Sequence, residues 1–511
     1  MKLANLSKLY TVEKKSSVHK NRDFVYIILL ALWLVMAWFV PLLAVIIMGA
    51  NLLALLSSRY VQFFSAGLQT KLAPAKQLRI FPKVSVHVPT YNEPPEIVAE
   101  TIKALTKLSY PNYEVIVLDN NTKDPEVWRP IQKLCATLGP NFKFQHIDEL
   151  SGFKAGALNV CYNLSHPDTE YILVIDADYC VSPNLLNEAL TYFTGEEVSL
   201  VQFPQAYVNS QDCNIGLTEE YNHFFKVYMN MANHYNCVLS TGTVSVIRKS
   251  ALEKVGLWSG QTITEDCELG LRFHQHGYRG VYVPKPLGKG LMPTDLKALK
   301  VQRERWVFGN MQTLRNFVGN TKHKLRFTQR IGIATQLTAW FSFLLVSVLA
   351  TVTGVVFYKL QAEPVYLMLS WLGVGAILFE LFSKYVFFSI ALRHSKNTLA
   401  KAWHTFLVNT GLAWEGATSW LRCLLGENIR FKRTNKFLGA VVQAKILPNL
   451  ILFIALLIAG ILALTSSFYF LGGLSIVASL PFLSVFYLKN ITRKTYQLAA
   501  VPKAQKLSRA A

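Results

Sequence analysis

The chain lacks the cysteine pattern of a zinc-bound or disulfide-bonded protein. Its 511 residues include seven cysteines, and these are scattered, without a Cys-x-x-Cys pair or a Cys/His cluster. Neither a zinc site nor a disulfide framework is therefore indicated. His274 and His276 lie two residues apart, so on a helix they would face different sides, and we expect them to be structural. No basic segment studded with aromatic residues is present, which disfavours a nucleic-acid partner.

Charged residues are also scarce, at 16%, whereas hydrophobic residues make up 51% and the mean hydropathy is +0.27. This composition is too apolar for an ordinary soluble enzyme. The apolar residues form uncharged blocks long enough to cross a membrane as helices. The first block is long enough for two short helices that turn near Pro41 or for one long tilted helix. Two helices are favoured, so the sequence predicts six spans. The blocks are residues 24–58, 331–358, 365–392, about 447–465 and 468–488.

Acidic residues are outnumbered, with 31 Asp and Glu against 52 Lys and Arg, which gives a net charge of +21. The basic residues gather at the N-terminus, in segments 59–83 and 393–445, and in the tail from Lys489. By the positive-inside rule, both termini and the long central block are expected in the cytoplasm. The excess indicates contact with anionic lipid headgroups rather than with nucleic acid.

Two aspartates follow an apolar run, residues 171–175, that has the length of a buried parallel strand. Asp176 and Asp178 would then emerge at the carboxyl end of the strand, where open α/β sheets bind ligands. Two carboxylates that flank one small residue suit Mg²⁺ or Mn²⁺ shared with substrate phosphates. A diphosphate-bearing substrate is therefore expected, although Asp-x-Asp alone is often a solvated turn.

A second acidic motif, Thr264-Glu265-Asp266, opens a stretch with helical spacing. Thr264 is the expected N-cap, and acidic residues are favoured near the positive end of the helix dipole. The motif is therefore consistent with a capped helix start. The functional interpretation is that one carboxylate is the general base that removes a proton from an attacking hydroxyl.

The third motif, Gln302-Arg303-Glu304-Arg305-Trp306, combines guanidinium groups with an indole ring. Arginine can stabilise a departing diphosphate, and tryptophan offers a flat apolar face to a sugar ring. An amphipathic helix on a bilayer is the alternative, since such helices often use Arg and Trp.

Together and in this order, the three motifs resemble those of the processive family 2 glycosyltransferases, the membrane synthases that include bacterial cellulose synthase and related β-glucan, chitin and hyaluronan synthases. The agreement runs from about Val84 to about Lys436. The resemblance implies a GT-A, Rossmann-like α/β domain in the cytoplasm combined with an α-helical transmembrane domain of about six helices. It also implies a nucleotide-sugar donor, with metal held by Asp176 and Asp178 and with Asp266, next to Glu265, as the catalytic base.

Further family segments are matched along the chain. Segments 84–93, 115–119 and 152–159 resemble the first strand, the nucleoside-contacting strand end and the Lys-Ala-Gly segment. The family often has Asp-Asp-Gly where this chain has Asp119-Asn120-Asn121, and its Phe-Phe-Cys-Gly cysteine is absent from segment 240–243. The implied donor contacts are Thr90, Tyr91, Glu93, Asp119, Lys154 and Asp176. The implied acceptor and diphosphate contacts are Thr241, Gly242, Gln302, Arg303, Arg305 and Trp306.

Segment 431–436 resembles the gating loop that closes over the donor, which implies that role for Phe431, Thr434 and Lys436, with Arg433 in place of a valine. The alternative is a basic juxtamembrane loop. The expected organisation is a basic N-terminus (1–23), two spans (24–58), the GT-A domain with an interfacial helix (59–330), two spans (331–392), an interfacial helix and the gating loop (393–446), two spans (447–488) and a basic tail (489–511).

Two membrane features add to this picture. Glu380 and Lys384 lie four residues apart within a predicted span, where an ionisable group is costly unless it is paired or faces water. A mutual ion pair is the first interpretation, and a polar path for sugar hydroxyls is the second. Segment 403–425 has aromatic residues among polar ones and predicts an interfacial helix.

The sequence therefore predicts an enzyme of the bacterial inner membrane that polymerises UDP-glucose into a β-glucan by inverting transfer and exports it. The expected partners are the donor, the growing polysaccharide, membrane lipids and accessory export or regulatory subunits. Three alternatives remain open: transfer of one sugar to a lipid, a synthase that uses another UDP- or GDP-sugar (chitin, hyaluronan or mannan type), and a transporter or scaffold with a degenerate transferase domain. Intact acidic motifs argue against the last.

Overall fold

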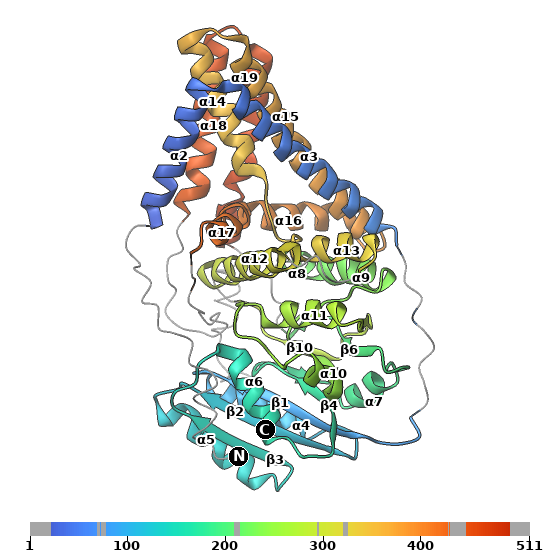
Figure 1. The fold of residues 1–511 in the computed structure, drawn as a ribbon. Coiled ribbons are helices and arrows are strands. Elements are labelled where there is room, and N and C mark those ends of the chain that lie inside the picture. Colours follow the sequence, from blue (N-terminus) through green and yellow to red (C-terminus); the bar gives the residue numbers. More distant parts are fainter. Residues whose placement is uncertain are drawn as a thin grey trace.

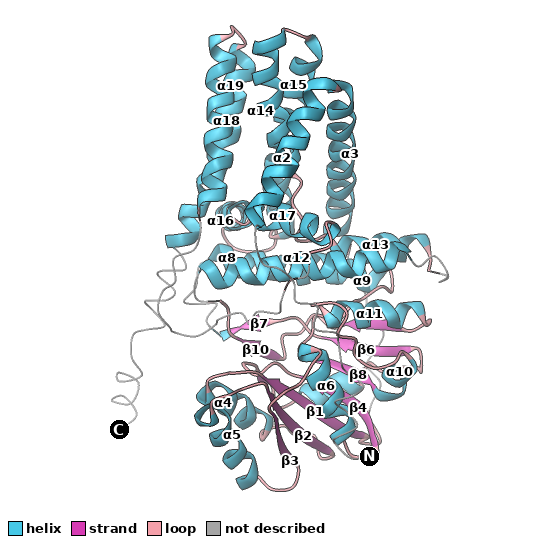
Figure 2. Cartoon of the chain, turned by 60° about the vertical axis from the view of Figure 1, so that its left-hand side comes forward, coloured by secondary structure: helices cyan, strands magenta, loops and turns pink. Residues whose placement is uncertain are grey.

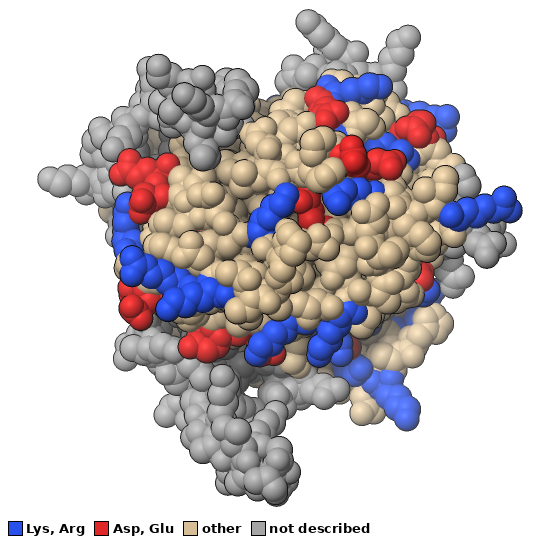
Figure 3. Space-filling model, turned by 90° about the horizontal axis from the view of Figure 1, so that it is seen from below, with Lys and Arg blue, Asp and Glu red and all other residues tan. Residues whose placement is uncertain are grey.

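The computed structural model describes residues 22–68, 72, 78–208, 215–293, 296–319, 325–427, 429 and 446–490. These residues form three layers stacked along one axis (Figure 1). An α/β unit lies at one end, helices that run across the axis lie in the middle, and long apolar helices form the other end. Seen from the α/β end, the described Lys and Arg side chains are interspersed with Asp and Glu (Figure 3).

A seven-stranded sheet forms the centre of the α/β unit, in the order β3-β2-β1-β4-β8-β6-β9. The first four strands in this order are parallel, whereas β8 runs antiparallel to β4 and β6. The strands are β1 Lys83–Thr90, β2 Tyr113–Asn120, β3 Phe142–Ile147, β4 Thr169–Val174, β6 Val198–Gln202, β8 Ser245–Arg248 and β9 Arg279–Tyr282. A small sheet of β5 (Cys180–Val181), β10 (Gly288–Gly290) and β7 (Ala206–Tyr207) lies between the main sheet and the helical layer (Figure 2).

Both faces of the main sheet are covered by helices, because its central strands are apolar on both sides. Successive side chains of a strand point to opposite faces. Val117 packs in one core with Val98 of α4, and the next residue, Leu118, packs in another with Ala157 of α6. Near-continuous apolar runs are typical of strands buried on both faces. The helices of this unit are α4 Pro95–Leu105, α5 Pro125–Thr137, α6 Phe153–Leu164, α7 Leu185–Leu190, α10 Lys249–Lys254 and α11 Glu265–Gln275.

The middle layer contains α8 Ile215–His223, a π-helical turn Phe224–Met229, α9 Asn230–His234, α12 Leu296–Gly319, α13 Phe327–Leu337, α16 Thr398–Gly411 and α17 Ala413–Leu424. Helix α8 packs on α16, and α12 packs on α17. The predicted single interfacial helix over 403–425 is therefore wrong in one respect, since the chain turns at Leu412. A side chain at Gly411 would collide with Leu488, so glycine permits this close packing.

The long helices are α2 Arg22–Phe39, α3 Pro41–Ala66, α14 Leu344–Gln361, α15 Pro364–Ala391, α18 Leu447–Thr465 and α19 Tyr469–Ser479, the last continuing through a 3₁₀ turn (Leu480–Leu483) toward Asn490. Within the described ranges, five helices are long and apolar enough to cross a membrane, and Tyr26–Phe39 is a shorter apolar helix. The predicted turn near Pro41 is confirmed.

The predicted span 331–358 is wrong at its start. Residues 327–337 form α13 in the middle layer, and the membrane-length helix begins only at Leu344. An uncharged composition alone does not distinguish these two environments, because both bury apolar side chains. The chain turns between them, where the Ser342 amide donates to the Gly416 carbonyl of α17 at 3.1 Å.

The predicted ion pair within α15 is confirmed. Lys384 Nζ lies 3.2 Å from Glu380 Oε1, and Arg59 Nη2 from α3 lies 3.7 Å from the same oxygen. Helix α3 continues past the predicted bound of residue 58 to Ala66, and the buried guanidinium of Arg59 has an anionic partner on α15.

Candidate active site

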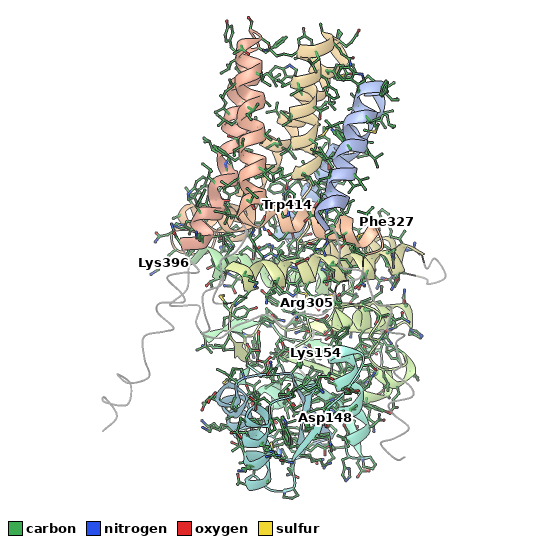
Figure 4. All side chains as sticks on the ribbon, turned by 90° about the vertical axis from the view of Figure 1, so that its left-hand side faces the viewer. Asp148, Lys154, Arg305, Phe327, Lys396 and Trp414 are labelled. Atoms are coloured by element: carbon green, nitrogen blue, oxygen red, sulfur yellow. The ribbon has the colours of Figure 1, made fainter. Side chains whose placement is uncertain are left out.

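A cavity of about 480 Å³ lies where the carboxyl ends of β1 and β4 face helix α12. This is the edge at which open α/β sheets bind ligands. Figure 4 shows Lys154 in the α/β unit and Arg305 above it in the helical layer. Many sequence-predicted site residues line this cavity: Thr90, Tyr91, Glu93, Lys154, Asp176, Asp178, Thr241, Gly242, Glu265, Asp266, Gln302, Arg305 and Trp306.

Lys154, at the start of α6, connects three parts of the cavity wall. Its Nζ donates to Asp176 Oδ1 at 2.6 Å and to the Gly242 carbonyl at 2.7 Å, and it lies 3.9 Å from Glu265 Oε1. Burial disfavours the ammonium, but the charges of Asp176 and Glu265 outweigh burial and raise the pKa of Lys154. The lysine is therefore a fixed positive charge beside the first aspartate.

Asp176 and Asp178 fit a divalent cation that is shared with a diphosphate. Both line the cavity just beyond β4, and Asp178 Oδ2 accepts a hydrogen bond from the Leu291 amide at 2.9 Å. Among the described residues, no third His, Cys, Asp or Glu joins them in a metal cluster. Substrate phosphates and water would therefore complete the coordination, as is usual for Mg²⁺ and Mn²⁺ at nucleotide sites.

Glu265 and Asp266 begin helix α11, with Thr264 at the N-cap position. The hydroxyl of Thr264 makes no capping hydrogen bond, so the expected side-chain cap is wrong. Burial, followed by the Asp266 charge, raises the pKa of Glu265 to about 7. Burial also raises the pKa of Asp266, against the opposing charge of Lys154. Glu265 is therefore suited to exchanging a proton near neutral pH, and the raised pKa of Asp266 makes its carboxylate a better proton acceptor than an ordinary aspartate.

Gly242 packs directly against the Asp266 carboxylate. Its φ is +83°, and a Cβ at this position would lie 2.5 Å from Asp266 Oδ2. Any larger residue would therefore be strained and would displace the carboxylate. The preceding residue, Thr241, is held by its amide, which donates to Gln202 Oε1 at 3.0 Å.

Helix α12 presents Gln302, Arg305 and Trp306 to the cavity, but not Arg303. The predicted contact of Arg303 with the diphosphate is therefore wrong. Arg303 is 2% exposed, and its Nη2 lies 2.6 Å from Glu220 Oε1. The reason is helical periodicity: positions i, i+3 and i+4 share one face, whereas position i+1 is turned by roughly 100°.

Asp119 is also absent from the cavity wall, so its predicted nucleoside contact is not supported. Its Oδ1 accepts hydrogen bonds from the hydroxyls of Thr90 at 3.0 Å and Thr122 at 2.8 Å. Its Oδ2 lies 2.8 Å from Nδ1 of His146. Burial raises the pKa of Asp119, and these hydrogen bonds act in the opposite direction. Its place at the wall is taken by the next two residues of the chain.

Sequence reasoning missed several wall residues. Asn120 ends β2 and Asn121 follows it at the wall, and Gln205 and Tyr207 line the cavity from the segment that leads from β6 into β7. Gln205 donates to the Thr241 carbonyl at 2.8 Å. For Asn120 and Asn121 the available signal was their position at the carboxyl end of the buried strand β2, where parallel sheets place ligand contacts. The predicted gating residues Phe431, Thr434 and Lys436 lie outside the described residues.

A second, smaller cavity of about 80 Å³ adjoins the first. Its aromatic wall consists of Tyr221, Phe224, Phe225, Trp306 and Trp340. Both cavities include Asp266 and Trp306 in their walls. A polar cavity and an aromatic cavity therefore meet at the proposed base.

Two family models match this chain. The model described as glycosyl transferase family 2 matches residues 85–256, and the model described as glycosyl transferase family group 2 matches residues 171–383. The chain contains a glycosyltransferase family 2 domain. The resemblance inferred from the motifs is thereby confirmed.

Curated relatives that this chain matches include polysaccharide synthases. The probable glucomannan 4-β-mannosyltransferase 11 of Arabidopsis thaliana is 31% identical over 276 residues, which are 52% of this chain and 61% of that protein. The cellulose synthase catalytic subunit (UDP-forming) of Xanthomonas axonopodis pv. citri (strain 306) is 27% identical over 277 residues, 52% of this chain and 37% of that protein. This chain spans roughly half the length of the curated relatives it matches.

Among solved structures, the mannosyltransferase PcManGT from Pyrobaculum calidifontis, in complex with GDP-Man and Mn²⁺, gives a TM-score of 0.52 at 15% identity. The match covers 75% of this chain and 99% of that chain. At this identity the likeness shows the fold alone. The predicted GT-A-like α/β core, combined with helices of membrane-spanning length, is confirmed.

Proposed function

We propose that this protein is a processive, inverting β-glycosyltransferase that polymerises UDP-glucose into a β-glucan and exports it across the membrane. The observation that carries this proposal is the junction of the two cavities at Asp266 and Trp306. The larger cavity offers acidic and basic groups suited to a nucleoside diphosphate and its cation. The smaller one offers aromatic faces on which sugar rings stack. A donor site beside an acceptor site is the arrangement that sugar transfer requires.

In this mechanism, Asp266 accepts the proton of the acceptor hydroxyl as its oxygen attacks the anomeric carbon of the donor. The bond from that carbon to the diphosphate breaks, and the electron pair leaves with UDP. Direct displacement on an α-linked donor gives a β-linkage. Asp176 and Asp178 would hold a divalent cation, which neutralises diphosphate charge when bound. Lys154 and Arg305 contact the diphosphate, and Trp306 stacks the terminal acceptor sugar.

The helical layer and the membrane-length helices support the polymer-forming version of this activity. The aromatic cavity is lined in part by α8, α12 and α13. These helices lie between the α/β unit and the long helices (Figure 1). We infer that a product that grows there passes toward the helix bundle. The distribution of basic residues favours a cytoplasmic catalytic unit on a bacterial inner membrane. A transferase that adds one sugar to a lipid has no need of such a path.

A second donor is favoured by the names of the relatives. Several curated relatives are glucomannan 4-β-mannosyltransferases, so GDP-mannose is the principal alternative to UDP-glucose. Both donors offer a hexose on a nucleoside diphosphate, and the groups at the diphosphate would serve either. The choice depends on contacts to the base and to the sugar hydroxyls.

The deciding experiment is nucleotide release by the purified, detergent-solubilised protein with Mg²⁺ or Mn²⁺, using UDP-glucose, UDP-N-acetylglucosamine and GDP-mannose. Products are sized and digested with linkage-specific hydrolases. We expect a long polymer from UDP-glucose that a β-glucanase degrades. A polymer only from GDP-mannose would replace the donor assignment. Turnover only with added lipid, one sugar per acceptor, would overturn the polymerase proposal.

A further inference from the structure

A buried ion pair lies behind the aromatic wall of the smaller cavity. Glu220 of α8 is 0% exposed and Arg303 of α12 is 2% exposed, and their side chains approach to 2.6 Å. Asn409 of α16 donates to the same Glu220 oxygen at 3.2 Å. Three helices of the middle layer therefore meet at one carboxylate.

Arg303 contacts the aromatic wall on its other side. Its Cζ lies 4.2 Å from the centroid of the Trp340 ring and 5.9 Å from that of Trp306. The two indole rings are themselves 5.2 Å apart. Such cation–π contacts favour a guanidinium placed over indole faces, most of all when it is desolvated. The position of Arg303 thus fixes the rings, and Glu220 fixes Arg303.

Stability alone does not account for a pair at this depth. Removing two charges from water costs several kcal/mol per ion, and well-packed apolar residues often serve stability as well or better. Moreover, Glu220 Oε2 and Arg303 Nε are buried without a hydrogen-bond partner among the described residues. The pair therefore fixes the orientation of the two side chains without satisfying all of their polar atoms.

We propose that Glu220 is a positioning residue for the acceptor: through Arg303 it holds Trp306 and Trp340 in the orientation that stacks the terminal sugar beside Asp266. The inference rests on the proposed function and deepens it, by assigning acceptor placement to a residue outside both cavity walls. A second contact from α8 also helps to hold Trp306 in place. Tyr221 donates a hydrogen bond to Gln302 Oε1, and its ring lies 5.6 Å from Trp306.

The test compares Glu220→Gln with Glu219→Gln in the full-length protein. Glu219 is the adjacent residue of α8, but it pairs with Lys226 at 3.2 Å and Lys401 at 3.3 Å and lines neither cavity. With cellohexaose or mannohexaose as the acceptor probe, Glu220→Gln should raise the acceptor KM by about tenfold or more and shorten the polymer. The donor KM, and kcat at saturating acceptor, should stay close to wild type. Glu219→Gln should change none of these.

An unchanged acceptor KM and product length in Glu220→Gln would overturn the inference, and so would an equal loss of donor affinity. If that variant does not fold, the double variant Glu220→Leu/Arg303→Met removes both charges and is expected to fold. It should show the same acceptor defect, and a wild-type acceptor KM in it would also overturn the inference. Glu220→Asp, which keeps the carboxylate, should give an intermediate KM.

Failure of the proposed function can be distinguished from failure of the inference about Glu220. If the wild-type protein turns over no nucleotide sugar, the proposed function fails. Calorimetric binding of the two hexasaccharides still tests whether Glu220 positions the aromatic wall for the acceptor. Weaker binding by Glu220→Gln than by Glu219→Gln supports the inference. Equal binding by both variants, or no binding by the wild type, overturns it.

Discussion

Lys154 lies 2.6 Å from Asp176 Oδ1 and 3.9 Å from Glu265 Oε1, so one ammonium group connects the strand end that carries the proposed metal ligands with the helix start that carries the proposed base. Its third contact, to the Gly242 carbonyl at 2.7 Å, fixes the loop that packs against Asp266. The electrostatic balance of the site therefore depends on this lysine.

We expect Lys154→Met to weaken nucleotide-sugar binding by about ten- to a hundredfold, because hydrogen bonds to charged groups contribute about 1.5–3 kcal/mol. Isothermal titration with UDP-glucose and GDP-mannose measures this loss. Lys103→Met is the matched control, since Lys103 is exposed and pairs with its own helix neighbour Glu100. Equal affinities in the two variants would contradict a role of Lys154 at the diphosphate.

Asp266→Asn should lower kcat by about 10²- to 10⁴-fold while leaving donor binding nearly unchanged, since general-base catalysis contributes that range. Nucleotide release and donor titration on the same preparation separate the two quantities. Glu268→Gln is a suitable control, because Glu268 lies on the same helix and pairs with Arg272 at 2.7 Å. Full polymer synthesis by Asp266→Asn would refute the assignment of the base.

The pH dependence of kcat/KM should show an acidic limb near neutrality. Burial and the Asp266 charge raise the pKa of Glu265 to about 7, so Glu265 loses its proton beside Asp266 as the pH rises through this region, and burial also raises the pKa of Asp266. The profile reports the pair rather than one residue. Glu265→Gln removes a negative neighbour of Asp266, which should shift the limb to lower pH. A limb at unchanged pH in this variant would contradict the coupling.

The raised pKa of Glu265 also makes the free energy of unfolding depend on pH. The pKa of Glu265 lies above its ordinary value of 4.5, so the folded state favours the protonated form. The free energy of unfolding should therefore fall as the pH rises from about 4.5 to about 7. Glu265→Gln should reduce this fall, which thermal unfolding between pH 5 and pH 8 measures.

Much of this architecture could be read from local patterns. The apolar run 171–175 predicts a buried strand, and β4 (Thr169–Val174) indeed ends just before Asp176 and Asp178. Helix α11 begins at Glu265 as its spacing predicts. The orientation of Arg303 could also have been predicted, since helical periodicity separates it from Gln302, Arg305 and Trp306. The roles of these residues stay predictions.

Other features depend on contacts between distant segments, which no local pattern reports. Asp119 is withdrawn from the cavity by His146, a residue of the next strand. Uncharged residues 331–358 divide between α13 and α14, because the chain turns where Ser342 meets α17. Likewise, the need for glycine at position 242 becomes evident only when Asp266 is seen beside it.

The membrane-side cluster of Arg59, Glu380 and Lys384 predicts an asymmetric response to mutation. Two cations share one carboxylate, with Glu380 Oε1 at 3.7 Å from Arg59 and 3.2 Å from Lys384, and all three side chains are at most 9% exposed. Glu380→Gln leaves two buried cations without a counter-charge, which should cost about 3–5 kcal/mol of stability. Lys384→Met keeps the Arg59–Glu380 pair and should cost much less.

Thermal unfolding in detergent tests this difference, and polymer synthesis in reconstituted vesicles tests its functional meaning. If the cluster is structural, folded Lys384→Met should still make polymer of wild-type length and deliver it across the bilayer. A loss of export with unchanged nucleotide release would instead favour a polar path for sugar hydroxyls along α15. Equal destabilisation by Glu380→Gln and Lys384→Met would refute the shared-carboxylate interpretation, because it would mean that Arg59 does not compensate the Glu380 charge once Lys384 is removed.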